Sequence, residues 1–511
     1  MGASYTRLPA NNPAIPFCII SFFHDQIHIF NADSNLVSLV RNCLQSHYPK
    51  GIQKESMRTD AVIFKCSGYP FSPIYSSTDH RNFLNFACAL LKELSQAGYI
   101  KVMSGDFCWY SDLSAWFFYK SPCNVATDIE FCAIDLWGWD KLKLFSCPPE
   151  INDAIKYVVA ENWKGIQRAE YEEECFTIKM KGYPWQSPSG EDGVKNRLLI
   201  MKIMQSMGQY GWTLYSATNV DAATDVLFFC RKKNLYISPA FTQSIFAISL
   251  NRNDRLRLMN ADGAVQDIIQ GVIRSFWPEI QNEGDHYGSY EFKLKGTPWW
   301  ARGESAMPSV TLLCQLFTAL RRSGWKAIMN LDISRSQNDK GVFFFVRMPP
   351  KDVNYCALSV KGSSNIYGVH LTPEITSHLQ QIIQGFFDFS RQPEQVYGGQ
   401  ATKWSLQCIP WASVGKSPQK FNSQLMIAGL INGMIGFNYH LCSSADISSI
   451  YVHRDKAPDY KPDGDTMFFG FDDPPFNVGL FTDIPAYTPP PDFYSSSAPP
   501  PPPSYDILFS S

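Results

Sequence analysis

The chain has 511 residues, of which 45% are hydrophobic and 18% are charged, so its composition is that of a globular protein with about three or four domains. Its net charge of −2 argues against a dedicated nucleic-acid binder and against a polybasic membrane binder, because both need an excess of Lys and Arg. The 14 cysteines show neither a C-x-x-C pair nor the Cys/His spacing of a zinc site, which predicts reduced thiols in the cytoplasm and no metal site.

Residues 1–16 form a polar N-terminal segment that begins with a lipidation motif. Met1-Gly2-Ala3-Ser4-Tyr5-Thr6 fits the M-G-x-x-x-[ST] pattern, which predicts N-myristoylation of Gly2. The alternative is that Gly2 merely follows the initiator methionine. A single myristoyl chain binds membranes weakly and reversibly, and the segment adds only one basic residue, Arg7. We therefore expect a cytoplasmic protein that is at most peripheral at a membrane.

Four copies of one unit of about 110 residues follow. Each copy has a proline-aromatic motif, a glycine-aromatic pair about 26 residues later, and a closing pair of phenylalanines. The proline motifs are Gly68-Tyr69-Pro70-Phe71, Gly182-Tyr183-Pro184-Trp185, Gly296-Thr297-Pro298-Trp299 and Ile409-Pro410-Trp411. Proline cannot donate a hydrogen bond within a sheet, and glycine readily adopts the left-handed conformation that ends a helix. The shared motifs therefore predict a common fold and not a ligand site.

Repeat 1 covers residues 17–122. Residues 18–23 and 26–30 are expected to form a hairpin, and Asn31-Ala32-Asp33 can cap the helix that follows. A strand is predicted at 61–65, and a second helix and two strands complete the unit.

Repeats 2, 3 and 4 cover residues 123–236, 237–350 and 351–471. In repeat 3, apolar residues from Val265 to Phe276 recur at helical spacing without a gap. Repeat 4 is the most divergent and carries a charged insertion at 453–465. The fold class predicted is α+β, with four tandem ββαβαββ repeats, each a mixed or antiparallel sheet covered by two helices.

The repeats also alternate in how their first helix starts. Repeat 3 has Asn260-Ala261-Asp262 where repeat 1 has Asn31-Ala32-Asp33, whereas repeats 2 and 4 have Pro149-Glu150 and Pro373-Glu374. This alternation suggests that a two-repeat block was duplicated and that the repeats pack in pairs.

Residues 472–511 are predicted to be a disordered, Pro-rich tail, since they are too poor in apolar surface to fold alone. Near its end, Pro502, Pro503 and Tyr505 form a PPxY motif of the type that WW domains bind. A polyproline II segment is already extended, so docking costs little ordering entropy. The motif resembles the ligands of Nedd4-type ubiquitin ligases, and this resemblance implies E3 ubiquitin ligases as partners. The alternative is a solubilising tail in which the motif arose by chance.

Tyr505 also belongs to a second motif. Tyr505-Asp506-Ile507-Leu508 resembles the YxxΦ sorting signals that clathrin adaptors bind, with Tyr505 and Leu508 as the contact residues. The two modes of binding would exclude each other. The run of five prolines from Pro499 to Pro503 also suits SH3, EVH1 or profilin-type grooves.

Enzyme motifs are missing from the sequence. There is no G-x-S-x-G, H-E-x-x-H, Walker A or Rossmann glycine motif, so neither catalysis nor a cofactor is predicted. Residues 340–346 resemble the aromatic strand of RRM domains, but the other repeats lack its basic start, and no nucleic-acid partner is expected. The sequence thus predicts a non-enzymatic adaptor or scaffold that recruits WW-domain proteins. The competing hypothesis is a ligand-binding protein or enzyme with its site between paired repeats.

Overall fold

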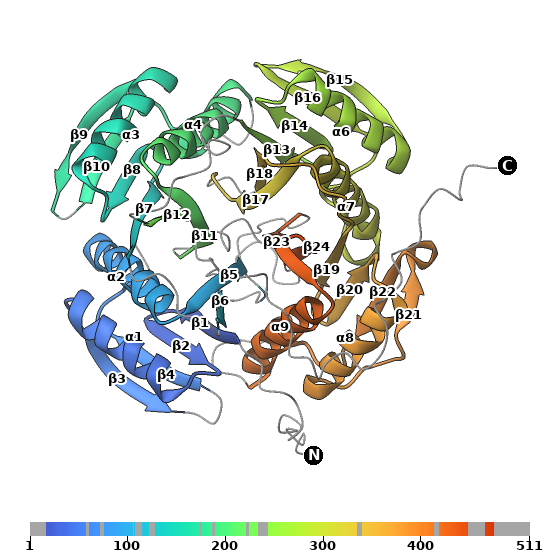
Figure 1. Cartoon of the computed structure of the whole chain (residues 1–511), viewed down its shortest axis with the longest axis horizontal. Helices are drawn as coiled ribbons and strands as arrows, with labels where there is room; N and C mark the ends of the chain where they lie inside the picture. Colours follow the sequence, from blue (N-terminus) through green and yellow to red (C-terminus); the bar gives the residue numbers. More distant parts are fainter. Residues whose placement is uncertain are drawn as a thin grey trace, which may run out of the picture.

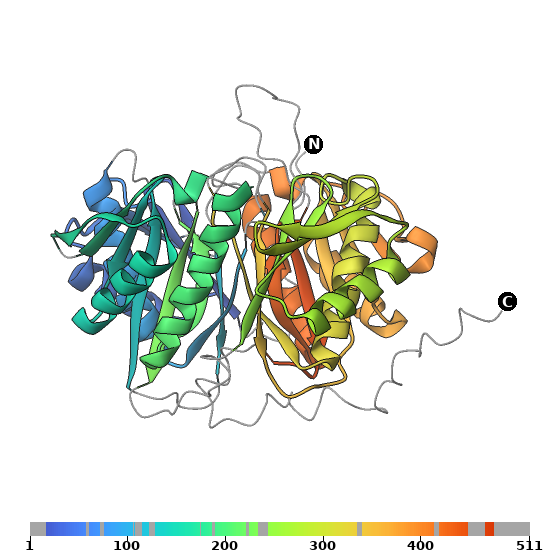
Figure 2. The ribbon, with the colours of Figure 1, turned by 90° about the horizontal axis from the view of Figure 1, so that it is seen from above.

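A computed structural model of the chain shows a ring of four similar units (Figure 1). It describes residues 17–57, 61–71, 76–105, 107, 115–121, 128–173, 175–186, 190–220, 224–232, 244–334, 340–412, 418–447 and 465–474. Each unit is one six-stranded sheet with two helices on one face, and all neighbouring strands are antiparallel. In the edge view of Figure 2, the strands run from one face of the ring towards the other.

The elements follow the same order in every repeat. Repeat 1 consists of β1 (Phe17–Phe23), β2 (Gln26–Phe30), α1 (Ser34–His47), β3 (Ile52–Met57), β4 (Ala61–Cys66), α2 (Ser77–Gln96), β5 (Tyr99–Gly105) and β6 (Ala115–Lys120). Repeat 2 consists of β7 (Ile129–Trp137), β8 (Lys141–Phe145), α3 (Pro149–Asn162), β9 (Ile166–Glu172), β10 (Cys175–Met180), η1 (Pro184–Gln186), α4 (Gly190–Gln209), β11 (Thr213–Asn219) and β12 (Asp225–Lys232).

Repeat 3 consists of β13 (Ile245–Asn251), β14 (Arg255–Met259), α6 (Gly263–Phe276), β15 (Ile280–His286), β16 (Ser289–Leu294), η2 (Gly303–Ala306), α7 (Met307–Arg322), β17 (Trp325–Leu331) and β18 (Val342–Arg347). Repeat 4 consists of β19 (Tyr355–Lys361), β20 (Asn365–Val369), α8 (Pro373–Phe386), β21 (Glu394–Val396), η3 (Tyr397–Gly399), β22 (Ala401–Ser405), η4 (Pro410–Ala412), α9 (Pro418–Gly436), β23 (Tyr439–Ala445) and β24 (Thr466–Phe471).

The prediction of four tandem α+β repeats is confirmed, with one strand more per repeat than expected. The order is ββαββαββ, because β3, β9, β15 and β21 precede the strand that was predicted between the two helices. These added strands form the outer edge of each sheet. β3 and β9 are largely exposed and polar on both faces, so they lack the alternation by which a strand is predicted.

The predicted starts of the first helices are also confirmed. The Asp33 carboxylate accepts a hydrogen bond from the Leu36 N–H at 2.7 Å, and Asp262 caps α6 through the Val265 N–H at 2.9 Å. In repeat 2, a proline occupies the first turn of α3 instead.

The sheets point their inner edges toward the middle of the ring, where β5, β11, β17 and β23 lie closest to its centre (Figure 1). Each of these strands contacts the inner strand of both neighbouring repeats, including β23 with β5, which closes the circle. At that closure the side-chain amide of Gln424 donates to the Ser21 hydroxyl at 3.2 Å. The repeats therefore form a continuous ring. The packing in pairs that the alternating helix starts suggest is wrong.

Each hydrophobic core is shared by two neighbouring repeats, because the two helices of a repeat lie between their own sheet and the next one (Figure 1). The closing pair of phenylalanines shows how this works, since successive residues of a strand face opposite sides. The first of each pair packs in the core of the preceding repeat, and the second in its own: Phe117 and Phe118, Phe228 and Phe229, Phe344 and Phe345, Phe468 and Phe469. This is why the paired aromatics recur in all four copies.

Candidate functional site

The residues that the sequence marked as functional lie outside the described part of the chain. They are Gly2 at the N-terminus and Pro502, Pro503, Tyr505 and Leu508 in the tail. Lipidation, WW-domain binding and sorting therefore stay predictions, and so does the disorder of the tail from residue 475. Most of the predicted insertion at 453–465 also lies outside the described residues.

The proline motif of the repeats is occupied by contacts that hold the fold together. Its glycine has a positive φ of 86°, 75° and 82° at Gly68, Gly182 and Gly296. The proline carbonyl then lies within hydrogen-bond distance of a side chain on the second helix of its repeat: His80 Nδ1 at 3.0 Å from Pro70, Asn196 Nδ2 at 2.7 Å from Pro184, and Ser309 Oγ at 2.8 Å from Pro298. The aromatic that follows is buried in every copy. These contacts agree with the structural role predicted for the motif.

In repeat 3 the same motif also forms a surface pocket of about 570 Å³. It is lined by Trp277, Thr297, Pro298, Trp300, Ala301, Arg302 and Ser305. Trp277 follows the end of α6, where its indole N–H donates to the Lys295 carbonyl at 3.0 Å. Trp300 follows the buried Trp299 and is 40% exposed. The pocket thus presents two indole side chains beside a proline and an exposed arginine.

The equivalent places in the other repeats are built differently. The residue that follows the first helix is buried there, as Tyr48, Trp163 and Phe387, whereas Trp277 is only half-buried. Gln186 and Ala412 stand where repeat 3 has Trp300. The tryptophan pair at the surface is therefore a departure of repeat 3 from the shared pattern, and the fold of the unit does not require it.

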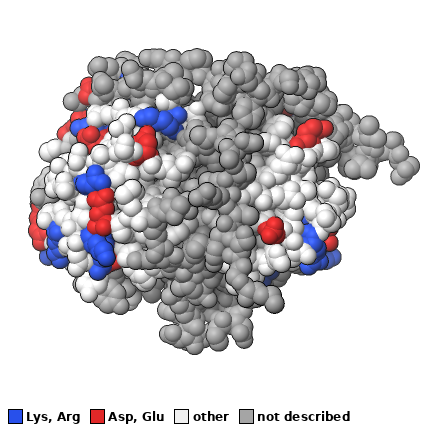
Figure 3. Space-filling view, turned by 90° about the horizontal axis from the view of Figure 1, so that it is seen from below, with Lys and Arg blue, Asp and Glu red and all other residues white. Residues whose placement is uncertain are grey.

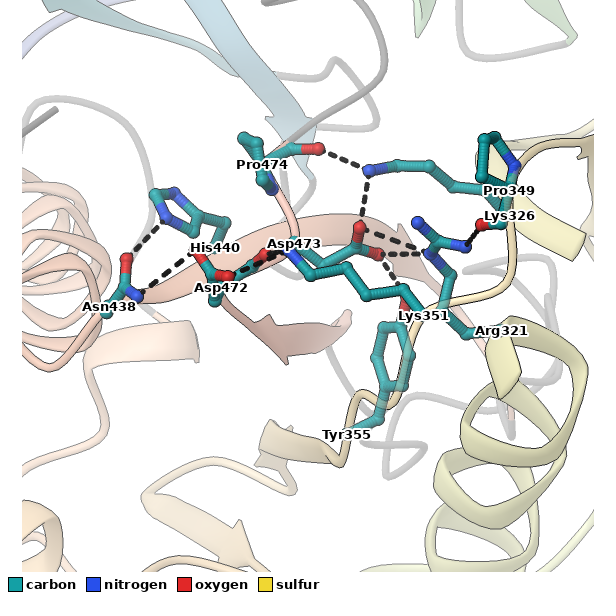
Figure 4. A network of polar contacts seen from close by, with 10 residues as sticks. All are labelled: Arg321, Lys326, Pro349, Lys351, Tyr355, Asn438, His440, Asp472, Asp473 and Pro474. Carbon is teal, nitrogen blue, oxygen red and sulfur yellow. Dashed lines mark hydrogen bonds and ion pairs between the residues drawn. The ribbon is translucent and has the colours of Figure 1, made fainter. Parts of the chain in front are cut away.

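A second distinctive site holds the root of the C-terminal tail (Figure 4). The Asp473 carboxylate accepts hydrogen bonds from Lys326 Nζ at 2.9 Å, from Arg321 Nε at 3.2 Å and from the Tyr355 hydroxyl at 2.8 Å. Arg321 lies in the last turn of α7, Lys326 lies in β17 and Tyr355 begins β19, so Asp473 joins repeats 3 and 4. Lys326 also donates to the Pro474 carbonyl. These contacts with the ring thus continue as far as Pro474, two residues past the predicted start of the tail at Asp472.

Burial and charge together set the protonation of this site. Burial raises the pKa of the Asp473 carboxyl, but the charge of Lys326 and the hydrogen bonds from Lys326 and Tyr355 outweigh it, and the pKa is lowered. Burial lowers the pKa of Lys326, and Asp473 partly offsets that effect. Burial also lowers the pKa of the nearby His440 to about 4, so its ring is neutral near pH 7. Asp473 therefore remains an anion that faces the guanidinium of Arg321 and the amino group of Lys326.

A third buried polar site lies between repeats 1 and 2. Lys101 in β5 donates to the hydroxyls of Ser104 and Ser216, and its Nζ lies 4.9 Å from the centre of the Trp116 ring. The Lys101 backbone N–H donates to the Tyr215 hydroxyl at 2.8 Å. Burial pushes the pKa of Lys101 well below its usual range. The contacts with Tyr215 and Ser216 join β5 to β11, the inner strand of repeat 2, whereas Ser104 lies in β5 itself.

No group of three or more His, Cys, Asp or Glu side chains in the described part of the chain is arranged to hold a metal ion. Among the helices described, none combines the length and hydropathy needed to span a bilayer. In the view of Figure 3, the described basic and acidic side chains are interspersed.

The comparison with protein families agrees with the fold. One domain-family model matches the chain four times, over residues 16–119, 130–230, 244–346 and 354–470, which together make up most of its length. The chain belongs to this repeat-domain family. Each match covers one sheet with its two helices, so the repeat-domain unit is one blade of the ring. No curated protein and no solved structure matches the chain.

Proposed function

We propose that this member of the repeat-domain family is a non-enzymatic adaptor, in which the ring is a rigid platform and the C-terminal tail recruits WW-domain proteins. E3 ubiquitin ligases of the Nedd4 type are the partners that the PPxY motif implies. N-myristoylation of Gly2 would add a reversible membrane tether to a protein that is otherwise cytoplasmic.

The observation that carries this proposal is the buried attachment of the tail root. Asp473 is 1% exposed and faces Arg321 and Lys326, so the chain leaves the ring at a fixed point. The PPxY motif follows about 28 residues after Pro474. A short motif on a tether of that length can reach a partner domain while the ring holds something else, which is the geometry an adaptor needs.

The interfaces between repeats favour the adaptor over the competing hypothesis of a ligand site between repeats. In the described residues, four apolar cores each cross from one repeat to the next, and the two buried polar sites between repeats, around Lys101 and Asp473, make their hydrogen bonds to neighbouring protein groups. The pocket described above lies within repeat 3 and is not between repeats. A binding platform with packed interfaces is the simpler interpretation of such a ring.

The proposal is tested by the affinity of an isolated Nedd4-type WW domain for the purified full-length chain. Tyr505→Ala should abolish binding, because the tyrosine ring fills the aromatic groove of the WW domain. Tyr494→Ala is the matched control, since this tyrosine lies in the same tail outside a PPxY sequence, and it should leave the affinity unchanged. Equal binding by the wild type and Tyr505→Ala would show that the motif is not used.

A further inference from the structure

The pocket on repeat 3 has the chemistry of a site for polyproline II peptides. Grooves that bind such peptides are lined by aromatic rings, between which the proline rings pack. Here Trp277 and Trp300 supply the rings, and Arg302 supplies a positive charge beside them. The other repeats bury or lack the equivalent tryptophans, so one site of this kind is expected per ring.

The chain carries a matching ligand in its own tail. The residues beyond Pro474 include the five prolines Pro499 to Pro503. They also include Asp483, Asp492 and Asp506 but no Lys or Arg, so the tail is acidic. This charge is complementary to Arg302 at the pocket.

The geometry of α7 brings the two together. The tail root is bound to Arg321 at the C-terminal end of this helix, and the pocket residues Arg302 and Ser305 lie just before its N-terminal end. A helix of 16 residues is about 24 Å long. About 25 residues run from Pro474 to Pro499, and a chain of that length in a polyproline II conformation would extend over about 75–80 Å, so the prolines can reach the pocket. Because the segment belongs to the same chain, its binding to the pocket would be intramolecular and would need less intrinsic affinity than binding of a separate peptide.

From these observations we propose that the Pro499–Pro503 segment docks in cis into the Trp277/Trp300 pocket and thereby masks the PPxY motif. The docking masks the motif because Pro502 and Pro503 belong both to the docked proline run and to the PPxY motif. The consequence of this docking rests on the proposed function: the adaptor is self-inhibited until a partner competes with the pocket for the proline segment. If the docked form accounts for between half and nine-tenths of the molecules, opening it raises the affinity for a WW domain about 2- to 10-fold.

The test uses the full-length chain and an isolated WW domain. Trp300→Ala should raise the affinity about 2- to 10-fold, and Arg302→Glu should act in the same direction by repelling the acidic tail. The control is Trp139→Ala, because Trp139 is a 54% exposed tryptophan beside Tyr183 on repeat 2, and its loss should change nothing. If Tyr505→Ala abolishes binding while neither pocket variant raises the affinity, self-masking is wrong and the adaptor proposal stands.

A second readout does not depend on WW binding. In the full-length chain labelled with 5-fluorotryptophan, the fluorine resonance lost in Trp300→Phe belongs to Trp300. This resonance should shift when residues 499–503 are replaced by Gly and Ser. A resonance that does not move overturns the cis docking, and a shift only on adding a separate proline-rich peptide assigns the pocket to another chain. If WW domains bind no variant but the resonance shifts, the docking is correct and the proposed function is wrong.

Discussion

Replacing Asp473 by alanine should detach the tail root from the ring. The substitution leaves the cationic groups of Arg321 and Lys326 buried without their shared carboxylate, since both side chains are only 6% exposed. The Tyr355 hydroxyl loses its acceptor at the same time.

The size of the effect follows from burial. Removing one member of a buried ion pair costs about 3–5 kcal/mol, because the remaining charge is then desolvated without compensation. The neighbouring Asp472 provides a matched control, since its ion pair with Lys351 is about half exposed, with side-chain exposures of 51% and 35%. An exposed pair contributes about 0–1 kcal/mol, so Asp472→Ala should have little effect.

Hydrogen exchange measured by mass spectrometry is suited to this comparison, because the root can open locally without unfolding the ring. In peptides from β24 and the start of β19, Asp473→Ala should accelerate exchange by about two orders of magnitude or more, and Asp472→Ala by less than about tenfold. Equal exchange in the two variants would refute the argument that buried charge fixes the root.

The same site predicts a dependence on pH. The folded-state pKa of Asp473 is lower than its unfolded value of about 3.9, so its stabilising contribution is complete above pH 4 and is lost as the pH falls through the folded-state value. Protection of the root against exchange should therefore decrease at acid pH in the wild type. In Asp473→Asn, whose amide does not titrate, that decrease should be smaller.

Other consequences can be tested with single substitutions. Gly324→Ala should destabilise the protein by more than Gly296→Ala, although both glycines have a φ near +83°. An added methyl group at residue 324 would lie 2.7 Å from a backbone carbonyl oxygen, whereas Gly296→Ala should cost only about 1–2 kcal/mol for its backbone conformation. Urea unfolding measures the unfolding free energy of both variants. Phe228→Ala should cost about 3–5 kcal/mol by leaving a cavity between repeats 1 and 2, whereas removing the exposed ring of Tyr157 should change the unfolding free energy by less than about 0.5 kcal/mol. Gly2→Ala should remove a myristoyl adduct from the intact mass, and a wild-type mass without the adduct would contradict the lipidation hypothesis.

Local chemistry explains what could be predicted from the sequence. The helix caps at Asp33 and Asp262 and the buried stripe of α6 depend on residues within a few positions of each other, and the structure contains them. The sequence does not indicate the outer strand β3, because its side chains face water on both sides and show no alternation of polar and apolar residues. Closure of the ring was missed for another reason: Phe117 looks like Phe344 in the sequence, and nothing in its neighbours shows that its core lies in repeat 4.

The candidate sites likewise have parts that the local sequence shows and parts that only the fold shows. Trp299 and Trp300 are visible as a doublet, but the exposure of Trp300 and its proximity to Trp277 follow only from the fold. The sequence alone places Asp473 in the tail, because it stands beside prolines and other aspartates. Its partners Arg321 and Lys326 lie about 150 residues earlier, which no local pattern can indicate.

The continuity of the cores has a consequence for the order of the repeats along the chain. Because repeat 4 packs on repeat 1 as each other repeat packs on the next, the position of the chain ends is incidental to the architecture. Short connections already join Lys120 to Ile129 and Arg347 to Tyr355. A linker of similar length should therefore join the end of β24 at Phe471 to the start of β1 at Phe17, with new termini placed between repeats 2 and 3 at residues 233–243. Such a circular permutant should fold to the same ring. A tail attached to its new C-terminus would then leave the ring at repeat 2 instead of repeat 4.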